Sequence, residues 1–297
     1  MDVLRTPDER FALLPGFPFE PRYVDAGGVR VHHIDEGPRD AETVLLLHGE
    51  PTWSFVWRHV IDELLRARLR VVALDLVGFG RSDKPVRRED HTYARHVEWT
   101  RQAIESIGVR DVTLVCHDWG GLIGLRLVAE QGRMFARVVA TNTGLPTGDV
   151  RMPDAFLQWQ QASQRIPEFP TARIVQGGTL TELSADVAAA YDAPFPSEEY
   201  KAAPRQMPLL VPTAPNDPGA VANRAAWRQL REWTRPFLCA FSDSDPITRG
   251  ADALFREAIP GCAGLDHPTI AGAAHFVQED RGAELGAIVA RFVASTP

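Results

Sequence analysis

Two kinds of segment alternate along the first half of the chain. Short, continuous apolar runs, expected for strands buried on both faces of a sheet, lie at residues 44–47, 71–74, 114–115 and 138–140. Longer stretches with apolar side chains at helical spacing lie at residues 53–67, 92–107 and 119–131. A strand hairpin is expected over residues 23–35, folded about Gly27 and Gly28. This alternation predicts an α/β protein whose mostly parallel sheet carries helices on both faces.

The alternation stops after residue 143. The next segment lacks strand patterns and has helical patterns at residues 152–165, 185–191 and 220–233. It is also rich in prolines, and those such as Pro204 and Pro208 are expected to mark loops between short helices.

Strand patterns return at residues 237–241 and 269–271, each followed by a helical pattern, at residues 251–259 and 283–294 respectively. We therefore expect a core formed by two separate stretches and interrupted by a helical cap. The cap should lie over the carboxyl ends of the strands, where open α/β sheets bind their ligands. The predicted division is residues 1–144 and 232–297 for the core and residues 145–231 for the cap.

The composition narrows the possible partners. Of the 297 residues, 44% are hydrophobic and 24% are charged, and the net charge is −7 at pH 7. Nucleic-acid binding needs a clustered basic surface, whereas the arginines here are scattered. Three cysteines, Cys116, Cys239 and Cys262, do not make a disulfide framework and favour a reducing compartment. With no apolar run of the roughly 20 residues that span a bilayer, and no signal-like N-terminus, we expect a soluble, cytoplasmic protein without nucleic-acid or membrane partners.

A reactive group is predicted where an apolar strand runs into a tight turn, in the sequence LVCHDWGG at residues 114–121. In α/β hydrolases such a turn lifts the nucleophile above the end of the sheet, and Gly120 and Gly121 supply small residues beside it. Cys116 stands where the motif usually has glycine. The nucleophile position holds Asp118, and a carboxylate can displace a leaving group from saturated carbon to form an ester that water then hydrolyses. Alkyl halides or epoxides are the substrates this indicates; the alternative is an aspartate that only caps the next helix.

A base that activates water is expected late in the chain. His275 follows a predicted strand and lies in a turn of small residues before the last helix. The chain order of nucleophile, acid and histidine in α/β hydrolases selects it among the nine histidines. The acid that orients the imidazole is expected after the strand at residues 237–241. Asp245, followed by the rigid Pro246, is favoured there, and Asp243 is the alternative.

Several N–H groups near Asp118 could bind negative charge. The sequence HGEP follows a buried strand at residues 48–51, and the backbone N–H of Glu50 could form an oxyanion hole with that of Trp119. The indole of Trp119 is a donor without acceptor capacity, which suits a departing halide. Trp159, in the predicted cap, is the second candidate halide donor, with a place in its helix core as the alternative.

Together these segments resemble haloalkane dehalogenases of the α/β-hydrolase superfamily, in particular the subfamily with glutamate after the His-Gly pair. The matching segments are HGEPTWS at residues 48–54, HDWGG at 117–121, AHFVQE at 274–279 and, within the predicted cap, DAPFP at 192–196. The similarity extends over nearly the whole chain.

The resemblance implies a role for each candidate: Asp118 as nucleophile, His275 as base, Asp245 as orienting acid, and Trp119 and Trp159 as halide donors. It implies hydrolysis of a small apolar halogenated substrate to an alcohol, a halide ion and a proton, through an alkyl ester of the aspartate. Water is the second reactant, and neither a metal nor an organic cofactor is implied. We expect a monomer or a small homo-oligomer.

Two other functions fit part of the pattern. An epoxide hydrolase would use the same nucleophile, base and acid, but that family normally has cap tyrosines that protonate the opening oxygen. Tyr191 and Tyr200 are the tyrosines of the predicted cap, and neither lies in such a pattern. A non-catalytic receptor with this fold would have no use for the complete set of Asp118, His275 and Asp245.

Overall fold

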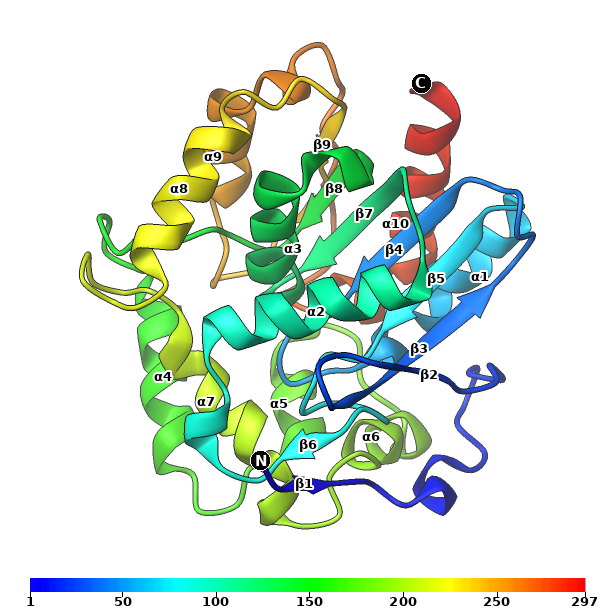
Figure 1. The fold of residues 1–297 in the computed structure, drawn as a ribbon, viewed down its shortest axis with the longest axis vertical. Coiled ribbons are helices and arrows are strands. Elements are labelled where there is room, and N and C mark those ends of the chain that lie inside the picture. Colours follow the sequence, from blue (N-terminus) through cyan, green and yellow to red (C-terminus); the bar gives the residue numbers. More distant parts are fainter. Residues whose placement is uncertain (297) are drawn as a thin grey trace.

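Seven strands form the central sheet of the computed structural model, which describes residues 1–296 (Figure 1). Across the sheet they are β2 (Arg22–Asp25), β3 (Arg30–Glu36), β5 (Arg70–Leu74), β4 (Thr43–Leu47), β7 (Val112–His117), β8 (Phe135–Thr141) and β9 (Phe237–Cys239). The five strands β5, β4, β7, β8 and β9 run parallel to one another. At the other edge β3 pairs antiparallel with both β5 and β2. Every residue of β4 and β7 is buried, as their uninterrupted apolar sequences predicted.

Helices cover both faces of the sheet, which confirms the predicted α/β architecture (Figure 1). In that view α2 (Tyr93–Ile107) and α3 (Trp119–Glu130) lie in front, and α1 (Arg58–Arg66) and α10 (Val277–Ser295) lie behind and pack on each other. The helix α9 (Ala251–Ala258) follows β9, the last strand of the large sheet, along the chain. Thr92 caps α2 by accepting a hydrogen bond from the N–H of Arg95 at 3.1 Å, and Gly108 ends that helix with a φ of 77°.

Smaller elements complete the core. Two short sheets are formed by β1 (Val3–Leu4) with β6 (Lys84–Pro85), and by β10 (Phe241–Ser242) with β11 (Thr269–Ile270). The 3-10 segments are Asp8–Phe11, Ser54–Trp57, Arg88–Asp90, Gly132–Met134, Glu198–Lys201 and Pro260–Cys262. The single strand predicted over residues 237–241 is divided into β9 and β10. The N–H of Ala240 still bonds to β8, whereas Phe241 leaves the large sheet and pairs with β11.

Between β8 and β9 the described chain forms helices only. They are α4 (Asp154–Arg165), α5 (Thr171–Gly177), α6 (Ala185–Asp192), α7 (Ala202–Leu210) and α8 (Ala220–Leu230). In Figure 1, α4 to α7 lie beyond the carboxyl ends of the parallel strands, and α8 packs beside α3 of the core. Because α8 contacts the core as well as continuing the helical segment, the exact division at residues 145 and 231 stays a prediction.

The expectation of a loop at Pro204 and Pro208 was wrong, because both prolines lie inside α7. Pro204 falls in the first turn, where a backbone N–H has no partner within the helix. The carbonyl of Pro208 is bonded from outside, by the side-chain amide of Gln160 at 2.9 Å. The two prolines thus lie in the first and last turns of a short helix, and a side chain of α4 satisfies a carbonyl of the last turn.

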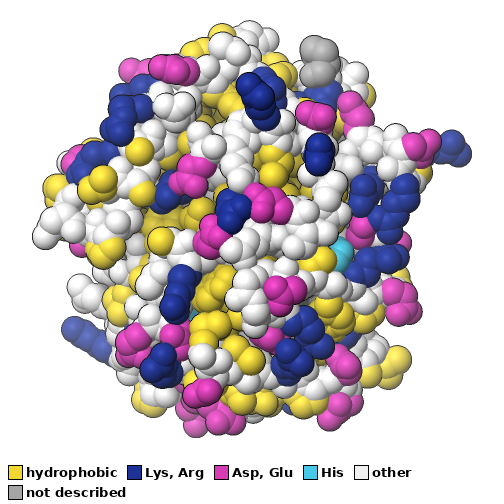
Figure 2. Space-filling view, in the orientation of Figure 1, with side chains coloured by type: hydrophobic (Ala, Val, Ile, Leu, Met, Phe, Trp, Pro, Cys, Tyr) yellow, Lys and Arg dark blue, Asp and Glu magenta, His cyan; other side chains and the backbone are white. Residues whose placement is uncertain are grey.

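Basic and acidic side chains are interspersed with apolar ones on the face shown in Figure 2. This mixed arrangement agrees with the scattered arginines of the sequence. Within residues 1–296, no helix is both long and apolar enough to cross a membrane.

Candidate active site

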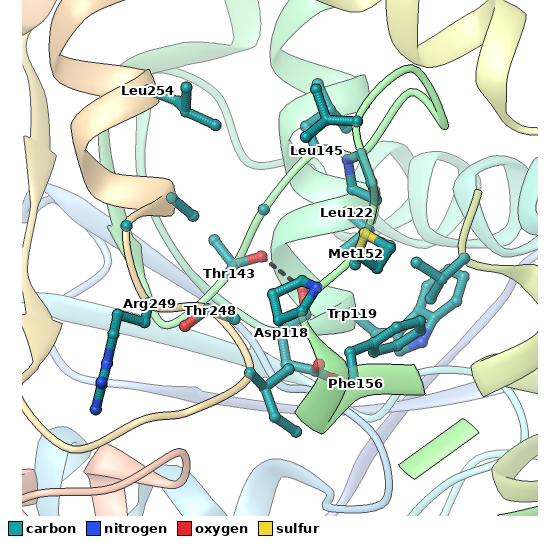
Figure 3. A pocket seen from close by; sticks show the side chains of 18 of the residues that line it. Asp118, Trp119, Leu122, Thr143, Leu145, Met152, Phe156, Thr248, Arg249 and Leu254 are labelled. Carbon is teal, nitrogen blue, oxygen red and sulfur yellow. Dashed lines mark hydrogen bonds between the residues drawn. The ribbon is translucent and has the colours of Figure 1, made fainter. Parts of the chain in front are cut away.

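Asp118 stands at the sharp turn between β7 and α3. Its φ of 48° is a left-handed conformation that few non-glycine residues adopt. The turn is fixed through its carbonyl, which accepts hydrogen bonds from the N–H of Gly121 at 2.9 Å and from the Thr143 hydroxyl at 2.7 Å (Figure 3). The carboxylate makes no capping hydrogen bond to α3, so a purely capping role does not describe it. The strained turn presents this carboxylate to a cavity instead.

Two glycines allow the chain to pack tightly around this turn. A Cβ on Gly120 would lie 2.0 Å from the carbonyl oxygen of Leu47, so the start of α3 meets the end of β4 backbone to backbone. A Cβ on Gly49 would lie 2.4 Å from the Asp118 carboxylate. This close approach lets the N–H of Glu50 donate to Oδ1 of Asp118 at 2.8 Å.

A chain of polar contacts leads from Asp118 to two groups on other loops. Nε2 of His275 lies 3.7 Å from Oδ2 of Asp118, and Nδ1 of His275 lies 3.0 Å from Oδ2 of Asp245. Asp245 also accepts hydrogen bonds from the N–H of Ile247, at 2.8 Å, and from the Thr248 hydroxyl. Because 3.7 Å exceeds a hydrogen-bond distance, Nε2 of His275 is not bonded to the carboxylate of Asp118.

Asp243, the alternative acid, lies elsewhere. Its exposed carboxylate accepts hydrogen bonds from the N–H of Gly272 at 3.1 Å and from the N–H of Ala273 at 3.4 Å. It stabilises the turn before His275 but is not its partner.

The three groups perturb one another's pKa values. Burial raises the pKa of Asp118, and the nearby His275 together with the N–H groups of Trp119 and Glu50 offsets part of that rise. Burial opposes the charged forms of Asp245 and His275 as well, but their mutual attraction and hydrogen bond outweigh it. The pKa of Asp245 is therefore lowered and that of His275 raised. Asp245 is thus held as an anion beside an imidazole that binds a proton readily.

Sequence patterns did not reveal the residues that hold the backbone of His275. The side-chain amide of Asn142 donates to the carbonyl of His275 at 3.0 Å, and Nε2 of His117 lies 2.8 Å from the same oxygen. Burial lowers the pKa of His117 to about 3, so His117 is a neutral donor. Both lie at the ends of two neighbouring strands, and His117 also opens the matched HDWGG segment, but neither signal assigned them this contact.

Glu50 carries a second buried carboxyl group at the site. Burial raises the pKa of Glu50 well above its usual range and the charge of Asp118 raises it further, while a hydrogen bond with the Trp159 side chain acts in the opposite direction. Its Oε1 atom has no hydrogen-bond partner among the described residues. Burial and the neighbouring charge of Asp118 therefore both oppose ionisation of Glu50.

The cavity in front of Asp118 has a volume of about 1300 Å³. Figure 3 shows Trp119 and Phe156 to one side of Asp118 and Thr248 and Arg249 to the other. Trp159 also lines the cavity and packs its ring against Phe169 at 6.0 Å. None of the described residues that line the cavity is a tyrosine.

Comparison with known proteins agrees with this arrangement. A family model described as the alpha/beta hydrolase fold matches residues 42–281. A haloalkane dehalogenase of Psychrobacter cryohalolentis is 51% identical over the full length of both chains, and one of Mycobacterium marinum is 48% identical over 96% of this chain and 97% of its own. Among solved structures, a haloalkane dehalogenase of Paraglaciecola agarilytica, described as tetrameric, superposes with a TM-score of 0.91 at 36% identity and 97% coverage of both chains.

The fold and the site therefore define an α/β hydrolase with an aspartate at the nucleophile position. Within that fold, the chain belongs to the haloalkane dehalogenases, hydrolases that act on carbon–halogen bonds. The resemblance drawn from the sequence is confirmed, and the epoxide-hydrolase and receptor alternatives are set aside.

Proposed function

We propose that this enzyme hydrolyses small apolar haloalkanes through a covalent ester of Asp118, with His275 as the base and Asp245 as the acid that orients it. The observation that carries the proposal is the position of His275 at the wall of an apolar cavity, with Nδ1 3.0 Å from Asp245 and Nε2 3.7 Å from Asp118. The products are an alcohol, a halide ion and a proton.

In the first step Asp118 attacks the carbon that bears the halogen. Oδ1 is held by the N–H of Glu50, so Oδ2 is the oxygen free to form the new bond. The electron pair of the carbon–halogen bond leaves with the halide as the ester forms. No proton is transferred in this step, so His275 acts only in the second one.

In the second step water attacks the ester carbonyl and gives its proton to Nε2 of His275. The oxyanion that develops is stabilised by the backbone N–H of Glu50, which already donates to the carboxylate, and by that of Trp119. The charge of Asp245 stabilises the imidazolium ion. Collapse of the intermediate releases the alcohol and restores the carboxylate of Asp118, and the proton passes to solvent.

The departing halide is assigned to the indole N–H groups of Trp119 and Trp159. Both side chains line the cavity beside Asp118, and Tyr93 packs edge-on against Trp119 with ring centroids 5.1 Å apart, which fixes that indole. Donors directed at developing negative charge accelerate its departure. Trp159 also lies within reach of the Glu50 carboxyl group, whose pKa its side chain lowers.

Three further proposals accompany this function, on the cap, the oligomeric state and the localisation. The helical segment 145–231 would act as the cap that closes the cavity over the core of residues 1–144 and 232–297. A small homo-oligomer is supported by the tetrameric relative, with a monomer as the other possibility. A cytoplasmic enzyme is supported by the three buried free cysteines.

The test is halide release from 1-bromobutane, 1,2-dibromoethane and a chloroalkane, with diol formation from styrene oxide measured alongside. Wild-type protein should release halide, and Asp118→Ala should abolish turnover. His275→Gln should still release about one halide per molecule and then retain the alkyl group as added mass on Asp118. Wild-type rates in Asp118→Ala, or a halide burst without the adduct in His275→Gln, would contradict the mechanism.

A further inference from the structure

The turn that carries His275 is held from two sides. On the core side, the amide of Asn142 donates to the carbonyl of Ala274 at 2.9 Å, and the N–H of Ser244 donates to the carbonyl of Ala273 at 3.1 Å. The carboxylate of Asp243 also binds the turn, through the N–H groups of residues 272 and 273. On the other side the turn meets residues 178–181, which connect α5 to α6 in the helical segment. The base therefore lies between the core and the cap.

Residues 178–181 touch the turn through the backbone. The N–H of Phe276 donates to the carbonyl of Gly178 at 2.9 Å. A Cβ on Gly178 would lie 2.6 Å from the ring of Phe276 and 3.6 Å from Cβ of His275. A side chain at position 178 would therefore have to displace the ring of Phe276 or push the segment away from the turn.

Asp280 bridges the same two parts of the chain. Its Oδ1 accepts hydrogen bonds from the N–H of Thr181 at 2.7 Å and from that of Leu180 at 2.9 Å, and its Oδ2 accepts the N–H of Ala274 at 2.9 Å. The side chain is buried, with 7% of its surface exposed. One carboxylate thus ties the cap to the residue immediately before His275.

Glu279, the preceding residue, makes a second link. It accepts a hydrogen bond from the hydroxyl of Tyr191 in α6 and pairs with Arg58 of α1, whose Nη2 lies 2.7 Å from Oε2. Arg58 and Glu279 are both almost completely buried. The φ of −142° at Arg281 interrupts α10 directly after Glu279 and Asp280. These two carboxylates therefore lie on a short first turn that is separate from the rest of the helix.

We propose that residues 178–181 of the cap, bound through Asp280, position His275 for hydrolysis of the alkyl ester. Asp280 touches neither substrate nor reacting atoms and acts only through the turn. The proposal rests on the proposed function, because it assigns the coupling to the second step alone. Formation of the ester depends on Asp118 and the halide donors, whereas hydrolysis needs Nε2 of His275 aligned with a water molecule.

The size of the effect follows from this alignment. Misplacing a reacting group by about 1 Å can slow a step by roughly 100-fold. The core contacts of His275 remain when Asp280 is removed, so a smaller displacement is expected. We therefore expect ester hydrolysis to slow by about 10-fold and ester formation to stay within about twofold of wild type.

The experiment compares Asp280→Ala with Asp243→Ala in single-turnover reactions with 1,2-dibromoethane. Both carboxylates accept N–H groups from residues 272–274, but only Asp280 also binds the cap. Bromide release reports ester formation, and intact-protein mass with alcohol release reports hydrolysis. Asp280→Ala should accumulate the ester, and Asp243→Ala, which leaves the link to the cap intact, should accumulate markedly less. Equal accumulation in the two variants, or none in Asp280→Ala, would overturn the positioning role.

Tyr191→Phe provides a second test that does not depend on the folding of Asp280→Ala. It removes only the hydroxyl that links α6 to Glu279, and it should slow hydrolysis in the same direction by a few fold. Unchanged partitioning in Tyr191→Phe would count against the coupling. If wild-type protein releases no bromide at all, the proposed function fails; wild-type bromide release with equal partitioning in every variant overturns only the role of the cap.

Discussion

Two carboxyl groups, Asp118 and Glu50, meet at the site and require opposite charge states. Asp118 is bound by the N–H of Glu50 and lies near His275, and these contacts favour its anion. The side chain of Glu50 has no cationic partner in the described structure, and burial favours its neutral form. A charged Glu50 beside the cavity would repel both the departing halide and the oxyanion of the second step. The neutral acid is therefore the form that suits the reaction.

Glu50→Gln tests this charge assignment. Because glutamine resembles the protonated acid in shape and charge, turnover at pH 7 should stay within about threefold of wild type. Wild-type turnover should decline at alkaline pH as Glu50 loses its proton, and the variant should lack that decline. The measurement is the pH dependence of halide release from pH 6 to 10, with Glu50→Ala as a control for loss of packing. A variant that declines as wild type does would show that Glu50 is not the titrating group.

At the scale of elements, the site depends on the close contact between α3 and the end of β4. Gly120 and Gly124 both face this contact from α3, but their neighbours differ. A Cβ on Gly120 would meet the backbone carbonyls of Leu47 and His48 at 2.0 and 2.7 Å, whereas a Cβ on Gly124 would meet side-chain methyl groups of Leu114 and Leu47 at 2.9 and 3.3 Å. Backbone atoms cannot move aside as side-chain ends can.

Gly120→Ala should accordingly destabilise the protein by about 3 kcal/mol and displace Asp118, which would nearly abolish halide release. In Gly124→Ala, the roughly 1 kcal/mol gained from replacing glycine inside a helix offsets most of the crowding. That variant should stay within about 1 kcal/mol of wild type. Urea unfolding of both proteins measures the difference, and equal losses in the two would contradict the packing argument.

The elements that the sequence predicted are those whose signal is local. The buried strands of the sheet appear as continuous apolar runs, and the turn at Asp118 has its own motif. The helix predicted over residues 283–294 begins six residues earlier, at Val277, and is interrupted at Arg281. The helix α5 and the proline-containing α7 were not predicted, because contacts with distant segments hold them rather than their own periodicity.

The same distinction separates the site residues. Chain order and motifs were enough to select Asp118, His275 and Asp245, which the structure brings into contact. Asn142 and Asp280 could not be selected, because their importance depends on which distant backbone groups reach them. Their partners lie between 6 and 133 residues away along the chain.

At the scale of the whole molecule, several histidines are buried in neutral form. Burial lowers the pKa of His33 to about 4 and that of His117 to about 3, and the pKa values of His48, His91 and His96 are also lowered, chiefly by burial. His91 and His96 face each other with Nδ1 and Nε2 3.2 Å apart, so at least one ring must remain unprotonated. In the unfolded chain each histidine titrates near pH 6.5.

These histidines predict a loss of stability in mild acid. Below about pH 6.5 the unfolded chain binds protons that the folded protein does not, so the free energy of unfolding falls as the pH falls. His33 and His117, whose pKa values in the folded protein lie near 4 and 3, should each contribute about 2 kcal/mol of loss by pH 5. His275, whose pKa is raised, acts in the opposite direction but is a single group. Carboxylates with lowered pKa values, such as Asp75 and Asp245, add a further loss below about pH 4.

His33→Gln isolates one of these contributions, because His33 lies in β3, outside the site described above, and its Nδ1 has no hydrogen-bond partner in the described structure. Urea unfolding at pH 8 compares the two proteins when both side chains are neutral and therefore measures packing alone. Between pH 8 and pH 5 the variant should lose about 2 kcal/mol less than wild type. An identical pH dependence would mean that His33 is protonated in the folded protein, and that its burial does not keep it neutral.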